Sequence, residues 1–213
     1  MATYSPEYGI KRTIHNIEGA YFRSKFEDGL PKFGEPTSGI GVISDTDAQP
    51  VIIQSHLGRT ALVTVARIDN FEEIEQYLLD NKHHFTEFSG GKTNQTEMIA
   101  ILIAEGKTLE DGVAHMFSKI KGSCSLLILH EDGTIYAVRD KLGRTPIIVG
   151  KKDGAVAVSS ESSAFHNLGY DIDYFIGPGE ILKITADGWS QVRPAGDKIQ
   201  ICSLFWVYFG FTS

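Results

Sequence analysis

Few side chains in this chain could do chemistry, and they are widely spaced. Asp45 and Asp47 share a polar loop and could form an acid pair or part of a cation site. A Ser-Asp-Thr-Asp loop more often bonds its own backbone, and we favour that interpretation. Cys124 and Cys202 lie far apart and have no Cys or His at metal-ligand spacing, so both are expected to be reduced and buried.

The sequence shows no other common ligand site. Neither a Walker pattern nor a Gly-x-Gly-x-x-Gly segment follows an expected strand, so no nucleotide site is predicted. His83 and His84 follow an expected helix and are interpreted as a solvated pair, and no cluster of metal ligands emerges. We therefore expect no cofactor and no metal.

The composition is typical of a compact globular domain. Of the 213 residues, 42% are hydrophobic and 22% are charged, and the length favours one large domain over 1–213. The net charge of -7 disfavours nucleic acid or an anionic membrane as a partner. No stretch approaches the roughly 20 apolar residues of a membrane span, and no signal peptide opens the chain. The expected compartment is the cytoplasm.

The expected elements follow the order strands, helices, strands. Extended segments are expected at 8–17, 20–26, 40–43, 51–54 and 60–66. Helical spacing after Asn70 predicts one helix, and capping patterns at Asn94 and Thr108 predict two more, through Ile103 and Ile120. Later strands are expected at 126–129, 134–138, 155–158 and 179–184. This order predicts the α+β class, with helices packed on antiparallel sheets.

The segment 139–150, Arg-Asp-Lys-Leu-Gly-Arg-Thr-Pro-Ile-Ile-Val-Gly, is the most informative part of the chain. It predicts a charged pair at the end of one strand, a Gly-x-x-Pro turn and an apolar strand. Asp140 can accept backbone hydrogen bonds in the turn, and Gly143 can take a conformation that other residues avoid. Arg139 is expected to pair with an acid such as Glu161.

Together with Ser-Glu-Ser-Ser-Ala at 160–164, this segment resembles the class II glutamine amidotransferases. The resemblance implies the N-terminal-nucleophile hydrolase fold, an αββα sandwich of two antiparallel sheets flanked by helices. Four segments favour the amidophosphoribosyltransferase branch over asparagine synthetase relatives: 160–170, 177–180, 47–50 and 202–209. The last resembles the family's exit into its phosphoribosyltransferase domain, which is expected to be absent from 1–213.

The resemblance implies that the family's nucleophile would stand at the start of the chain. In this family an N-terminal cysteine attacks the side-chain amide of glutamine, and its own α-amine serves as the base. Here Met1 is followed by Ala2. Residues 1–5 resemble the stretch that follows the family's Arg-Gly-rich loop, so the first strand and that loop are expected to be missing.

Three internal positions of the implied glutamine site also depart from the family. The Arg that holds the glutamine carboxylate falls within 41–45, which contains no Arg. The family's His-Asn-Gly oxyanion segment matches Thr64, Val65 and Ala66, and Val65 offers no side-chain donor, a loss of roughly 3 kcal/mol of transition-state stabilisation. Gln95 replaces the acid that pairs with the substrate's ammonium group.

These departures imply a domain without glutaminase catalytic residues, in which Thr64, Ala66 and Gln95 mark a degenerate substrate pocket. The first hypothesis is a regulatory or structural amidotransferase-type domain, with a phosphoribosyltransferase domain or chain, or a second copy of itself, as partner. The second is a fragment of a working amidophosphoribosyltransferase of purine biosynthesis, dependent on glutamine or ammonia. The third is a small-molecule binding domain with a remodelled pocket.

Overall fold

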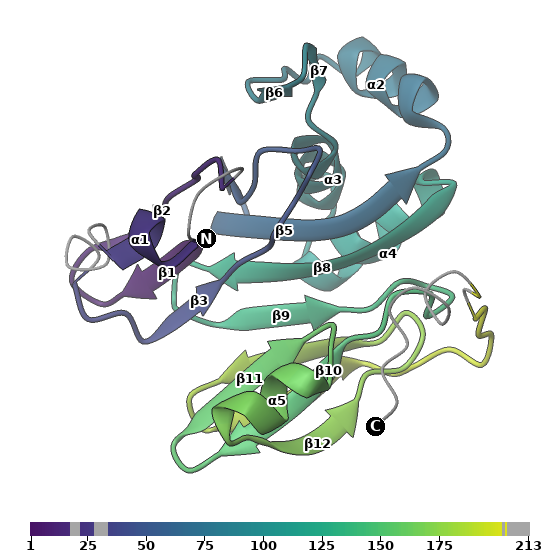
Figure 1. Cartoon of the computed structure of the whole chain (residues 1–213). Coiled ribbons are helices and arrows are strands. Elements are labelled where there is room, and N and C mark those ends of the chain that lie inside the picture. The colour runs from purple at the N-terminus through teal and green to yellow at the C-terminus, as the bar shows by residue number, and fades with distance from the viewer. Residues whose placement is uncertain (18–21, 28–33, 202, 204–213) are drawn as a thin grey trace.

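The computed structural model describes residues 1–17, 22–27, 34–201 and 203, and a six-stranded antiparallel sheet lies at its centre (Figure 1). The strand order is β14-β13-β9-β8-β5-β4. In chain order, the strands are β4 (Val51–Ser55), β5 (Gly58–Ile68), β8 (Gly122–His130), β9 (Ile135–Val138), β13 (Ile181–Thr185) and β14 (Gly188–Arg193). The two longest strands, β5 and β8, pair from Thr60↔His130 to Ile68↔Gly122.

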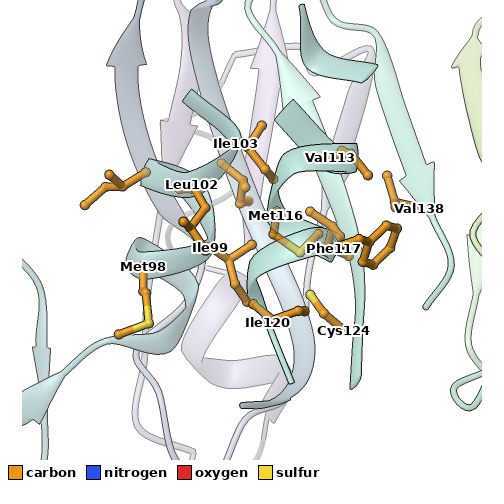
Figure 2. Packing of buried hydrophobic residues seen from close by; sticks show 14 of the residues in the cluster. Met98, Ile99, Leu102, Ile103, Val113, Met116, Phe117, Ile120, Cys124 and Val138 are labelled. Carbon is orange, nitrogen blue, oxygen red and sulfur yellow. The ribbon is translucent and has the colours of Figure 1, made fainter. Parts of the chain in front are cut away.

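Three helices cover one face of this sheet: α2 (Phe71–Asp80), α3 (Gln95–Ala104) and α4 (Leu109–Lys119). Because side chains alternate along a strand, Leu126 and Ile128 of β8 point to the helices and join Met98 and Met116 in the main core (Figure 2). None of the helices in the described ranges is long and apolar enough to cross a membrane.

The opposite face packs on two three-stranded antiparallel sheets. One has the order β2-β1-β3, from β1 (Ala2–Ser5), β2 (Gly9–Arg12) and β3 (Ser38–Ile40). The other has the order β11-β10-β12, from β10 (Ile148–Lys152), β11 (Ala155–Ser159) and β12 (Asp171–Phe175). Val63 and Leu129 pack against the first sheet, and Ala137 and Leu182 pack against the second.

Helix α5 (Ser163–Leu168) lies on the outer side of the β10 sheet (Figure 1). Its Phe165 is buried so closely over Gly150 that a Cβ at Gly150 would clash with the ring. The layers are therefore helices, sheet, sheets and helix, which confirms the predicted αββα sandwich. The remaining elements are α1 (Phe22–Glu27), β6 (Phe88–Ser89) and β7 (Lys92–Thr93).

Most predicted elements are confirmed, and two expectations are wrong. The segment 20–26 was expected to be extended, but α1 occupies Phe22–Glu27. It holds no β-branched residue, and Arg, Lys and Glu lose little rotamer freedom in a helix. Asn70 precedes α2 without a side-chain capping bond, because its amide instead accepts from Lys121 N–H (2.7 Å) and donates to the Lys119 carbonyl (3.1 Å). The caps at Asn94 and Thr108 are confirmed.

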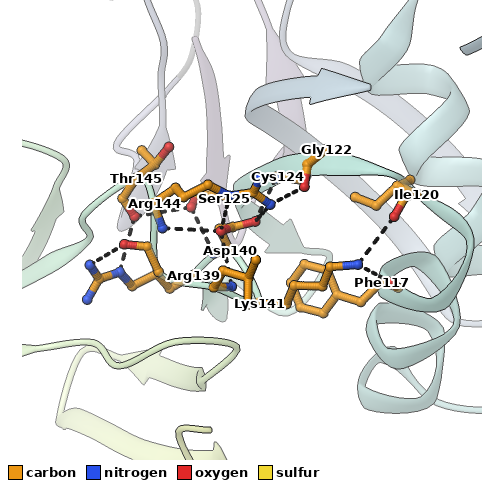
Figure 3. Close-up of polar contacts among 12 residues, drawn as sticks. Phe117, Ile120, Gly122, Cys124, Ser125, Arg139, Asp140, Lys141, Arg144 and Thr145 are labelled. Carbon is orange, nitrogen blue, oxygen red and sulfur yellow. Dashed lines mark hydrogen bonds and ion pairs between the residues drawn. The ribbon is translucent and has the colours of Figure 1, made fainter. Parts of the chain in front are cut away.

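The turn after β9 is organised by the buried carboxylate of Asp140 (Figure 3). It accepts from the backbone N–H groups of Cys124 (3.2 Å), Leu142 (3.1 Å) and Arg144 (3.1 Å), and Arg144 Nε lies 3.0 Å away. Burial alone would raise the pKa of Asp140, but these hydrogen bonds and the Arg144 charge outweigh it, so the pKa is lowered. Gly143 adopts φ +68°, as expected for this turn.

The expected pair between Arg139 and Glu161 is wrong. The Arg139 guanidinium instead donates to the carbonyl oxygens of Thr145 (3.2 Å), Ile176 (2.5 Å) and Gly143 (2.6 Å). Several carbonyls of an irregular turn are left without strand partners, and a five-donor guanidinium satisfies three of them.

We predict that Asp140→Asn destabilises the protein by about 3–5 kcal/mol at pH 7, since it leaves Arg144 without its buried partner. Because the folded-state pKa of Asp140 is lowered, its contribution is present above about pH 4 and is lost as the pH falls through the folded pKa. Urea unfolding should be measured for the wild-type protein and for Asp140→Asn between pH 7 and pH 3. The difference between their free energies of unfolding should become smaller as the pH falls. Asp69→Asn, in the exposed pair with Arg67, is the control and should cost at most about 1 kcal/mol.

We also predict that Gly112→Ala in α4 is destabilising, although Ala normally favours a helix interior over Gly by about 1 kcal/mol. A Cβ at Gly112 would collide with the carbonyl of Ile103, where α3 and α4 meet. Thermal unfolding should show a lower Tm. The reverse change at an exposed site of the same helix, Ala114→Gly, should cost only about 1 kcal/mol. A raised Tm for Gly112→Ala would contradict this packing.

Candidate functional site

A hollow of about 130 Å³ lies between β5 and the loop that leads into β4. It brings together Thr64 and Ala66, two of the three predicted pocket residues, with the segment 41–45. Its complete wall consists of Val42, Ile43, Ser44, Asp45, Thr46, Asp47, Gln49, Thr64, Val65 and Ala66. The structure thus places Thr64 and Ala66, two of the predicted positions, beside the loop that leads into β4.

The edge of β5 at the hollow is held by a side chain. Regular pairing of β4 with β5 runs from Ser55↔Gly58 to Val51↔Leu62. Beyond that point the buried Gln49 amide takes over, because its Oε1 accepts from Thr64 N–H (2.7 Å) and its Nε2 donates to the Thr64 carbonyl (3.2 Å). The Thr64 hydroxyl bonds the Thr96 hydroxyl of α3 at 2.7 Å. The backbone N–H, the carbonyl and the hydroxyl of Thr64 thus all form hydrogen bonds within the protein.

Gln95, the third predicted residue, lies beside the hollow as the first residue of α3. The backbone N–H of Gln95 lies close to the Asp47 carboxylate, and the Gln95 side chain is not among the wall residues. Burial raises the pKa of Asp47, and the nearby Gln95 N–H opposes this only in part. The expected local bonding of the loop holds for Ser44, whose Oγ accepts from Asp47 N–H at 3.1 Å.

The loop is also fixed from the side of the β6–β7 hairpin. Ala48 N–H donates to Ser89 Oγ (3.0 Å), and Asn94 Nδ2 donates to the Ala48 carbonyl (2.9 Å). Asn94 simultaneously caps α3 by accepting from Thr96 N–H (2.8 Å) and Glu97 N–H (3.2 Å). One side chain therefore couples the hollow's loop to the start of α3.

The wall carries negative charge and exposed apolar side chains. Asp45 and Asp47 are acidic, and no Lys, Arg or His is found among the described residues of the wall. Val65 is 46% exposed and Ile43 is 75% exposed. The nearby Arg67 does not line the hollow and pairs with Asp69 at 3.0 Å. The hollow thus suits a ligand with two parts, one that is cationic or neutral and one that is apolar.

Cys124 does not line this site. Cys124 is a free, fully buried thiol in the core beneath α4, as expected, and burial followed by the nearby Asp140 charge raises its pKa (Figure 2). Cys202, and most of the segment 202–209, lie outside the described residues. In the part of the chain that the structure describes, no three His, Cys, Asp or Glu side chains are arranged to hold a metal.

We predict that Gln49→Ala loosens the hollow, since it removes the partners of both backbone groups of Thr64. A buried group left unpaired costs about 1–3 kcal/mol, so unfolding should require less denaturant and hydrogen exchange at Thr64 N–H should accelerate. Gln54→Ala, at an exposed position of β4, is the matched control. It should change neither the denaturant concentration needed for unfolding nor the exchange rate at Thr64 N–H. An unchanged exchange rate in Gln49→Ala would contradict the assigned role.

Known proteins match the chain over this site. A family model described as "Glutamine amidotransferase domain" matches residues 38–167. Amidophosphoribosyltransferase of Rattus norvegicus is 29% identical over 234 residues, which cover 93% of this chain and 44% of that protein. The enzyme of Mycobacterium bovis is 32% identical over 119 residues, covering 54% of this chain and 22% of that protein. The chain thus spans less than half the length of these relatives.

Solved structures agree with this match. Glutamine phosphoribosylpyrophosphate amidotransferase from B. subtilis, complexed with ADP and GMP, gives a TM-score of 0.66 at 28% identity, over 78% of this chain and 36% of that one. A glutamine aminotransferase class-II domain protein from Silicibacter pomeroyi gives 0.53 at 14% identity, over 92% and 90%, and shares the fold. Because the family model spans both walls of the hollow, the chain belongs to the class II glutamine amidotransferase family and is homologous to the amidophosphoribosyltransferase glutaminase domain.

Proposed function

We propose that this chain is an amidophosphoribosyltransferase-like amidotransferase domain that does not hydrolyse glutamine and has a regulatory or structural role. The observation that carries the proposal is the wall of the hollow, whose described residues include two carboxylates and no cation, at positions where the family resemblance implies a glutamine site. A glutamine carboxylate placed there would meet like charges in place of a bidentate Arg.

The oxyanion position supports the same proposal. Hydrolysis of an amide develops negative charge on its oxygen, and donors preorganised around that oxygen are worth about 2.7–4 kcal/mol each. Val65 presents an isopropyl group at this wall, and the neighbouring Thr64 N–H is already bonded to Gln49. Neither can meet a developing oxyanion without breaking the bonds that hold the edge of β5.

The ammonium position supports it as well. Gln95 is neutral, and its backbone N–H points at Asp47. An α-ammonium group bound beside Gln95 would lack the ion pair that the family resemblance implies. Carboxylate, oxyanion and ammonium positions have therefore all changed together, which is expected of a pocket released from glutaminase chemistry.

The proposed partner is a phosphoribosyltransferase domain or chain. This rests on the relatives, because the amidophosphoribosyltransferase of Rattus norvegicus is more than twice as long as the region of it that this chain matches. A domain that keeps the sandwich but not the reaction would act on such a partner through contact, in the cytoplasm. Pairing with a second copy of the chain belongs to the same proposal.

A second candidate is that the chain is part of a working amidophosphoribosyltransferase that uses glutamine or ammonia. The coverage favours it, since the match accounts for only 44% of the rat enzyme. A phosphoribosyltransferase domain can in principle accept free ammonia, which would leave the amidotransferase domain without a chemical task. The assay below separates the two candidates.

We predict that the protein expressed from its full open reading frame releases glutamate from glutamine more than about 10³-fold more slowly than the B. subtilis enzyme measured in parallel, as expected when oxyanion stabilisation is lost. Glutamate release is followed with a coupled dehydrogenase assay. Cys124→Ala is the internal control and should change nothing, because its thiol is buried and its pKa is raised. Turnover within tenfold of the B. subtilis enzyme would sink the proposal and favour the second candidate.

A further inference from the structure

We infer that the hollow beside β5 binds a small organic cation, a primary ammonium on a short apolar group without a carboxylate. The inference rests on the proposed function, because a pocket that serves glutamine would need an anion-binding group as well. It goes further by assigning the hollow a ligand class of its own.

The size of the hollow limits the ligand to a small molecule. Its volume is about 130 Å³. An engineered protein cavity of about 150 Å³ holds benzene, so the hollow accommodates on the order of five to seven non-hydrogen atoms. A nucleotide or a peptide side chain longer than lysine would project into solvent.

The charge of the wall selects the sign of the ligand. Asp45 and Asp47 contribute two formal negative charges, and the wall has no basic side chain to neutralise them. The Gln95 N–H lies close to the Asp47 carboxylate, and a carboxylate has room for about four donors. It can therefore accept a further charge-assisted bond from an ammonium group. The chain's net charge of -7 adds a long-range attraction for cations.

The apolar part of the wall distinguishes an organic cation from a metal ion. Val42, Ile43 and Val65 line the hollow, and the last two are largely exposed to water. Hard metal ions take six or more oxygen ligands, and hydrocarbon side chains cannot supply them. An alkyl group on the ligand would cover these side chains and remove apolar surface from water.

The same wall disfavours the alternatives to an amine. An amino acid would bring a carboxylate against Asp45 and Asp47, and like charges at close range repel. A neutral alcohol would gain the apolar contact but would leave the acidic charge uncompensated. A primary amine satisfies both parts of the wall at once.

The test is a titration of ¹⁵N-labelled protein with n-butylammonium, followed by two-dimensional NMR. We expect saturable shifts at residues 42–49 and 64–66, with Kd on the order of 1 mM, as suits a ligand of five heavy atoms. The matched neutral and anionic probes, 1-butanol and butyrate, should bind at least tenfold more weakly. Equal binding of either probe would overturn the inference, as would shifts centred elsewhere.

The matched variants are Asp47→Asn and Asp69→Asn. Asn is close to Asp in size, and the backbone N–H of residue 47 keeps its bond to Ser44 Oγ, so the loop should stay in place while butylammonium binding weakens at least tenfold. Asp69 pairs with Arg67 and does not line the hollow, so the Asp69→Asn variant should bind butylammonium with an unchanged Kd. Should Asp47→Asn disturb the loop, Asp45→Asn provides a second test on an exposed side chain, with a weaker but measurable loss expected.

The two proposals fail separately. Rapid glutamine hydrolysis would overturn the proposed function, whatever butylammonium does. Absence of saturable butylammonium binding, or an unchanged Kd in both Asp47→Asn and Asp45→Asn, would overturn this inference while glutamine remains unhydrolysed.

Discussion

The arrangement of the layers depends on one buried carboxylate, that of Asp140. Removing a carboxylate from water costs several kcal/mol, and the cost is offset here only because Arg144 and three backbone N–H groups converge on it. One of those N–H groups belongs to Cys124 in β8, and the others belong to the turn that leads to β10. The adjacent Arg139 extends the same network to the carbonyl of Ile176, just after β12. The network thus connects the central sheet to the sheet beneath it.

The hollow depends on this network through strand pairing. Fixing the start of β8 fixes its register with β5, in which Cys124 opposes Ala66 and Leu126 opposes Thr64. The other edge of β5 has no strand partner at that height, and Gln49 substitutes for one through two hydrogen bonds. One edge of β5 at the hollow is therefore held by pairing with β8, and the other is held by the Gln49 amide. The charged and apolar side chains of the wall come largely from the loop before β4.

The sequence predicted the features that local patterns encode. The β-branched run at 60–66 became the centre of β5, and the caps at Asn94 and Thr108 formed because a cap is decided within four residues. The family resemblance also named Thr64 and Ala66 as pocket residues, and both line the same wall in the structure. The partners of Asn70 and Arg139 were missed for two reasons. Tertiary packing brings the Lys119 carbonyl to Asn70 and the Ile176 carbonyl to Arg139, and no spacing in the sequence predicts such contacts. The other two carbonyls that Arg139 bonds, those of Gly143 and Thr145, belong to its own turn, whose irregular backbone the sequence pattern did not define. The proximity of Asp47 to Gln95 also arises from tertiary packing.

Asp47 also shows how a bound cation would act on the hollow. The start of α3 favours a nearby negative charge by about 0.3–1 kcal/mol, and the Gln95 N–H lies close to the carboxylate. The pKa of Asp47 is nevertheless raised, so burial outweighs both and its surroundings disfavour the ionised form. An ammonium group bound in the hollow would offset this cost, because a nearby opposite charge favours the ionised carboxylate.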